Sequence, residues 1–72
     1  MKTELIVTFD TTHMALWAEE VARAENIPME VIPAPPERRA RCDLALAFRP
    51  VDLDRLRAAL DAAGVLYEAP EV

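Results

Sequence analysis

The chain has 72 residues, of which 13 are acidic and 8 are basic, giving a formal net charge of -5 at pH 7. This length fits one domain over residues 1–72, and the acidic balance argues against nucleic acid as the main partner, because neutralising phosphates requires a basic face. One cysteine and one histidine exclude an internal disulfide and are too few for a four-ligand zinc site, so we expect neither a metal nor a cofactor.

The first two predicted elements are a strand and a helix. Residues 5–9 read Leu-Ile-Val-Thr-Phe, a β-branched and aromatic run that is apolar on both faces and is typical of a central strand. Asp10, Thr11 and Thr12 then offer side-chain oxygens that can cap a helix. The helix is expected over residues 13–25, with a mostly small apolar stripe at three- and four-residue spacing, formed by Met14, Ala15, Ala18, Val21 and Ala22. We expect Asn26 to be left-handed and Pro28 to prevent the helix from resuming.

The rest of the chain is predicted to form two further strands, a second helix and a final strand. Residues 29–32 and 44–48 are both predicted as strands, the latter because large and small side chains alternate. Asp52 is expected to cap a second helix, with Val51 and Leu56 forming a hydrophobic staple. Its core stripe is Leu53, Leu56, Leu60 and Ala63. Gly64 falls where a helix end favours positive φ, and residues 65–68 are predicted as a fourth strand.

This β-α-β-β-α-β order predicts an α+β, ferredoxin-like fold with two helices on one face of a four-stranded antiparallel sheet. Strands one and three would be antiparallel neighbours at its centre. The end of the first strand would then lie beside the start of the third. We therefore expect residues 10–13 to lie at the same end of the molecule as Cys42, which would face the N-terminus of the first helix.

The segment from Pro33 to Cys42 carries the candidate chemistry. Arg38, Arg39 and Arg41 immediately precede the single cysteine, and nearby positive charge favours the nucleophilic thiolate over the thiol. Asp10 and Asp43 oppose this effect with negative charge. The segment is equally consistent with a solvated loop that uses arginine for solubility, and Cys42 with a small, half-buried apolar residue at the start of a strand.

Several short motifs resemble a family of small domains described as selenium/sulfur carrier-like proteins. They are the opening strand ending in Phe9, Thr12-His13 followed by Ala15 and Glu19, Ile27-Pro28, Pro33-Ala34-Pro35, and Cys42 before the strand 44–48. The resemblance spans nearly the whole chain. It differs after the cysteine, where this chain has Asp43 in place of the family's glycine. The resemblance implies that Cys42 carries sulfur or selenium received from a donor protein and passed to an acceptor protein.

Two functions remain open at this point. In the first, Cys42 is the acceptor thiol, His13 orients or deprotonates it, and Thr11, Thr12, Arg38, Arg39 and Arg41 bind or tune the anionic group. In the second, the chain is a non-catalytic ferredoxin-like module that binds a protein or a small anion at the arginine segment, and His13 is simply an exposed polar residue. Either role is that of a carrier or binding module rather than a turnover enzyme.

The sequence also indicates partners and location. A sheet face made of Ile6, Ala45, Ala47 and Leu66 would point away from the helices, so we expect a homodimer or a stable partner to cover it. No apolar run approaches the roughly 20 residues that a membrane helix needs, and Glu4 lies where a signal peptide is basic or apolar. An unpaired cysteine fits a cytoplasmic protein.

Overall fold

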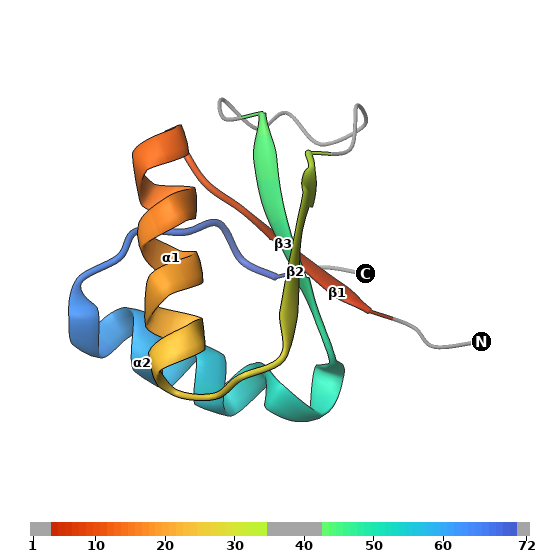
Figure 1. Ribbon diagram of the computed structural model, residues 1–72, viewed down its shortest axis with the longest axis vertical. Coiled ribbons are helices and arrows are strands. Elements are labelled where there is room, and N and C mark those ends of the chain that lie inside the picture. The colour runs from red at the N-terminus through yellow and green to blue at the C-terminus, as the bar shows by residue number, and fades with distance from the viewer. Residues whose placement is uncertain (1–3, 35–42, 71–72) are drawn as a thin grey trace.

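The computed structural model describes residues 4–34 and 43–70. Within them the chain forms β1 (Leu5–Thr8), α1 (Thr12–Ala24), β2 (Met29–Pro33), β3 (Leu44–Phe48), the short 3-10 turn η1 (Pro50–Asp52) and α2 (Leu53–Ala63). The strands make an antiparallel sheet in the order β1-β3-β2. Both helices contribute to one hydrophobic cluster with the sheet, so they share one of its faces (Figure 1). The α+β class and the pairing of the first and third strands are confirmed.

The alternation of large and small side chains on β3 decides which face of the sheet is buried under the helices. Leu46 pairs with Val7 of β1 and Val31 of β2, and all three side chains belong to or pack against the core. Ala45 and Ala47 are buried but lie outside that cluster, as expected for the opposite face of a strand. The large residues of β3 therefore face the helices and its alanines face away.

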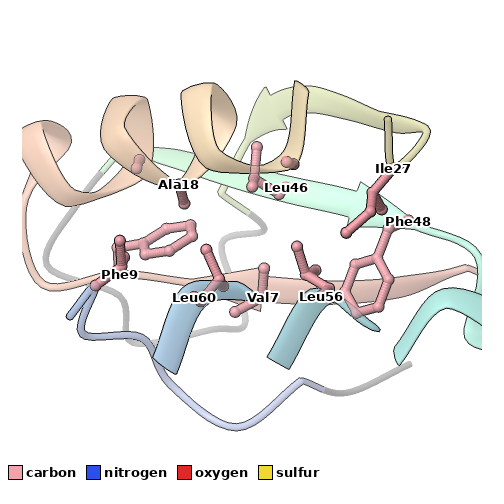
Figure 2. Packing of buried hydrophobic residues seen from close by; sticks show 11 residues of the cluster. Val7, Phe9, Ala18, Ile27, Leu46, Phe48, Leu56 and Leu60 are labelled. Carbon is pink, nitrogen blue, oxygen red and sulfur yellow. The ribbon is translucent and has the colours of Figure 1, made fainter. Parts of the chain in front are cut away.

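The small side chains of α1 bring this helix close to the sheet. Ala15, Ala18 and Ala22 are its buried residues, and they follow one stripe at three- and four-residue spacing. Figure 2 shows Ala18 above the ring of Phe9, with Leu60 of α2 on the other side of the core. A larger residue at these positions would push the helix away from the aromatic rings that fill the centre.

Both helices end in the same way. Asn26 has φ 58 and Gly64 has φ 86, so each helix is followed by a left-handed residue. The next amide then bonds back into the last turn: the Ile27 N–H donates to the Ala22 carbonyl at 2.9 Å, and the Val65 N–H to the Leu60 carbonyl at 3.0 Å. Ile27 and Val65 are both buried, so the residue that follows each left-handed position also packs in the core.

The predicted fourth strand is not present as a strand among the described residues, where the sheet has three strands instead of four. The segment after α2 runs back to β1, and the Glu68 N–H donates to the Thr8 carbonyl at 2.8 Å. In an antiparallel ladder the next residue of that segment to bond on the same side would be residue 70. That residue is proline and has no N–H, so the ladder does not extend.

The start of α2 also differs from the sequence prediction. The side chain of Asp52 makes no capping hydrogen bond, and Val51 is 77% exposed, so no hydrophobic staple with the buried Leu56 forms. Pro50 begins the 3-10 turn η1, which precedes α2 directly. Asp52 is instead buried and forms ion pairs with Arg49 and Arg55.

Candidate functional site

One end of the sheet collects the residues on either side of the candidate cysteine. Pro33 at the end of β2 pairs with Leu44 at the start of β3, and Thr8 near the end of β1 pairs with Ala45. The Ala34 N–H donates to the Asp43 carbonyl at 2.8 Å, which fixes the two ends of the 35–42 connection next to each other. Helix α1 begins at this same end of the molecule (Figure 1).

Four predicted site residues, Cys42, Arg38, Arg39 and Arg41, lie outside the described residues. Their roles therefore stay predictions. Asp43, which follows Cys42 directly, is exposed at the sheet end where α1 starts. We predicted that residues 10–13 lie at the same end of the molecule as Cys42. The start of α1 and Asp43 do lie at the same end, whereas the position of Cys42 itself stays a prediction.

Thr11 and Thr12 lie at the beginning of α1, and Thr11 is the N-cap. Its hydroxyl oxygen accepts from the Met14 N–H at 3.1 Å, and its carbonyl accepts from the Ala15 N–H at 3.2 Å. The cap was predicted from the residues 10–12, and the structure identifies Thr11 as the residue that provides it. Thr12 is the first residue of the helix and is exposed.

His13 is exposed in the first turn of α1, and its imidazole lies against an indole. The ring centroids of His13 and Trp17 are 6.2 Å apart, and the ring planes meet at 42°. These residues also line a shallow hollow of about 440 Å³ with Leu16 and Glu20. The residue pattern of α1 did not lead us to predict this hollow. Its signal was the spacing of residues 13, 16, 17 and 20, which places four side chains on one face of a helix.

A second hollow of about 460 Å³ lies between α2 and the segment that follows it. Its lining includes Arg57, Asp61 and Tyr67, and the Tyr67 hydroxyl donates to Asp61 Oδ1 at 2.9 Å. Burial raises the pKa of the Tyr67 phenol above its ordinary value of 10.0, and the hydrogen bond to Asp61 adds to this rise. This group was also missed from sequence, because residues 61 and 67 belong to different local structures.

The described residues show two further properties. Within residues 4–34 and 43–70 there is no group of three or more histidine, cysteine, aspartate or glutamate side chains that could hold a metal ion. Neither helix in these ranges is long and apolar enough to span a membrane.

Comparison with known protein families identifies a relationship for this chain. The family model described as "Putative Se/S carrier protein-like" matches residues 4–69, which is most of the chain and includes the whole segment between β2 and β3. No curated protein sequence and no solved structure matches the chain.

Proposed function

The chain belongs to the Se/S carrier protein-like family, and we propose that it is a single-thiol carrier in which Cys42 accepts sulfur or selenium from one protein and delivers it to another. The family match over residues 4–69 is the observation that carries this proposal. The position of Asp43 supports it, because this neighbour of Cys42 lies at the sheet end where α1 also begins.

The proposed transfer is a pair of thiolate exchange steps. The Cys42 thiolate attacks the terminal sulfur of a donor persulfide, so a new S–S bond forms on Cys42 while the donor's S–S bond breaks and the donor leaves as a thiolate. An acceptor thiolate then attacks the outer sulfur, and Cys42 leaves as a thiolate. Each step moves one sulfur atom and needs no external oxidant or reductant. Selenium would follow the same exchange.

The surrounding residues have proposed supporting roles. Arg38, Arg39 and Arg41 favour the thiolate through their charge, and the first turn of α1 at Thr11 and Thr12 adds the field of the helix terminus. His13 orients the thiol or accepts its proton. Asp10 and Asp43 act in the opposite direction, because a nearby negative charge disfavours a thiolate.

The proposal is tested by measuring the reactivity of the Cys42 thiol and the adduct that it forms. We expect Cys42 to be alkylated at lower pH than a free cysteine and to gain the mass of one sulfur atom after incubation with a cysteine desulfurase and cysteine. The variant Cys42→Ser should gain nothing, and replacing the three arginines by glutamine should move alkylation to higher pH. A thiol of ordinary or raised pKa that gains no adduct would contradict the carrier and favour a module that binds a protein or an anion without chemistry.

The proposal also assigns partners and a compartment. A carrier needs a donor and an acceptor protein, and a reducing cytoplasm would keep Cys42 available as a thiol. We further propose that two copies associate through the sheet face that carries Ala45 and Ala47. The helices pack on the opposite side, and Ala45 and Ala47 are already buried within one chain, so a partner would contact the half-buried Ile6 and Ile32 that flank them.

A further inference from the structure

The outer face of α1 carries a hollow whose lining has an unusual composition for a solvated helix. His13, Leu16, Trp17 and Glu20 border about 440 Å³ of open space. Leu16 is 47% exposed and is one of three large exposed apolar side chains among residues 4–34 and 43–70. The helix face turned away from the sheet is normally polar, but here an exposed leucine lies beside an indole whose other contacts are with the core cluster, which makes this surface a candidate for binding.

Two neighbouring rings, those of His13 and Trp17, line this hollow. Trp17 is half-buried and packs against the core cluster, and its ring centroid lies 6.2 Å from that of His13. An indole face attracts either apolar groups or cations, because its π electrons give it a negative face. The two rings alone are therefore compatible with either an apolar ligand or a cation.

Glu20 distinguishes between those two kinds. Its neighbour Glu19 is engaged by Arg23, whose Nη2 lies 2.8 Å from Glu19 Oε2. Glu20 is exposed and has no ion pair within the described part of the chain. A free carboxylate beside an indole and a leucine favours a cation with an apolar stem. Arginine fits best, because its planar guanidinium can stack on the indole while it donates to the carboxylate.

We propose that this hollow receives an arginine side chain from the surface of a partner protein. The chain's net charge of -5 favours a partner with a basic surface. The hollow lies in the first turns of α1, and α1 starts at the sheet end that carries Asp43 (Figure 1). A protein docked there would sit at the same end of the molecule as Asp43, the residue that follows Cys42 in the sequence. Naming this partner as the sulfur donor or acceptor rests on the proposed carrier function, whereas the arginine site does not.

The experiment uses Trp17, the only tryptophan in the chain, as the reporter. Full-length protein carrying Cys42→Ser is titrated with a blocked arginine-rich peptide, and its tryptophan fluorescence is followed. We expect a saturable change that is absent with a citrulline peptide of the same length. Glu20→Gln should weaken binding about fivefold. The matched control Glu30→Gln removes the same charge from β2 and should bind as the parent does.

Three results would overturn the site. They are equal binding of the citrulline peptide, equal weakening by Glu20→Gln and Glu30→Gln, and binding detected by calorimetry with no change at Trp17. A second variant, Leu16→Ala, should also weaken binding because it removes the apolar wall. Since the cysteine is absent from this protein, failure here leaves the carrier proposal untouched. Failure of the sulfur transfer test likewise leaves this site untouched.

Discussion

Asp52 is a buried carboxylate, 3% exposed, that pairs with one arginine before it and one after it in the chain. Its Oδ2 accepts from Arg49 Nε at 2.9 Å, and its Oδ1 lies 3.8 Å from Arg55 Nη1. Arg55 also donates through Nη2 to the Glu25 carbonyl at 2.7 Å, just beyond the end of α1. One carboxylate therefore positions the arginine that ties the start of α2 to the end of α1.

Replacing this carboxylate should cost stability. We expect Asp52→Asn to lower the free energy of unfolding by about 1–2 kcal/mol, because both arginines lose a charged acceptor but remain exposed enough to turn to water. Urea denaturation measures the change. Asp54→Asn, an exposed carboxylate in the first turn of α2, is the control and should cost about 0.5 kcal/mol or less. Equal effects would mean that Asp52 acts only on the helix dipole.

Tyr67 makes a separate residue-scale prediction, because it is the only tyrosine and titrates alone. Burial, and then the hydrogen bond to Asp61, raise its pKa above 10.0, so folding favours the neutral phenol. The resulting stabilisation is complete below pH 10.0 and is lost as the pH rises through the higher folded-state pKa. Alkaline solution should therefore weaken the packing of this segment on α2.

The charges beside Tyr67 should shift its pKa in opposite directions. Asp61→Asn should lower the pKa, because it removes an anion that opposes phenolate formation, while Arg57→Gln should raise it further. Ultraviolet absorbance of the phenolate against pH measures both. Shifts of the same sign in the two variants would refute this account.

At the scale of elements, a left-handed residue determines where each helix ends. A Cβ built on Gly64 meets nothing within 4 Å, so the site has room for a side chain. The cost of an alanine there is therefore purely the backbone strain of its left-handed conformation, with φ 86. The end of α1 shows that asparagine can occupy the equivalent position, since Asn26 has φ 58.

We expect Gly64→Ala to destabilise the protein by about 1–2 kcal/mol, measured by chemical denaturation. Gly64→Asn is the matched variant and should cost less, because asparagine tolerates the left-handed region better than alanine does. If alanine and asparagine cost the same, the strain is not the cause and the αL stop is not what fixes the end of α2.

At the scale of the whole molecule, the sheet has one face under the helices and one face away from them. Ile32 pairs with Ala45 on this second face, and neither residue belongs to the core cluster. Glu30 pairs with Ala47 on the same face, two residues along the strands, so the face is mixed rather than wholly apolar. Both residues lie on β2, an edge strand, so Ile32 would give an interface on this face an apolar contact and Glu30 a charged one.

The proposed homodimer can be tested on this face. We expect sedimentation velocity to show a dimer, and Ile32→Gln to shift it toward monomer at the same concentration, because the variant places an amide in the apolar part of the interface. Leu16→Gln changes an exposed leucine on the helical side and should leave the dimer intact. A parent protein that stays monomeric at high concentration would contradict the interface.

Much of this architecture follows from local sequence. The Leu-Ala-Leu-Ala-Phe alternation of β3 predicts which residues face the helices, and Asn26 and Gly64 predict where the helices end. These features are local because a strand's period and a left-handed residue each depend on a few positions. The two helices with their apolar stripes are also confirmed.

The errors arose where the residue pattern of one element does not by itself determine the outcome. The fourth strand fails beside Pro70, whose missing N–H outweighs the strand preference of the residues before it. Asp52 is paired with arginines rather than used as a cap, because the turn at Pro50 changes its direction. The hollow at Trp17 was missed because residues at three- and four-residue spacing can form either a buried or an exposed stripe of a helix. The spacing alone does not show which stripe faces the sheet.

The hydrogen bond from Glu68 to Thr8 has a consequence for biosynthesis. It joins nearly the last described residue to the first strand, and Val65 completes the core beside Val7 and Phe9. A nascent chain that has emerged from the ribosome only as far as α2 would still expose these aromatic and aliphatic groups. Folding of this domain should therefore wait until residue 68 has cleared the exit tunnel, and the ribosome itself would set the moment at which the domain closes.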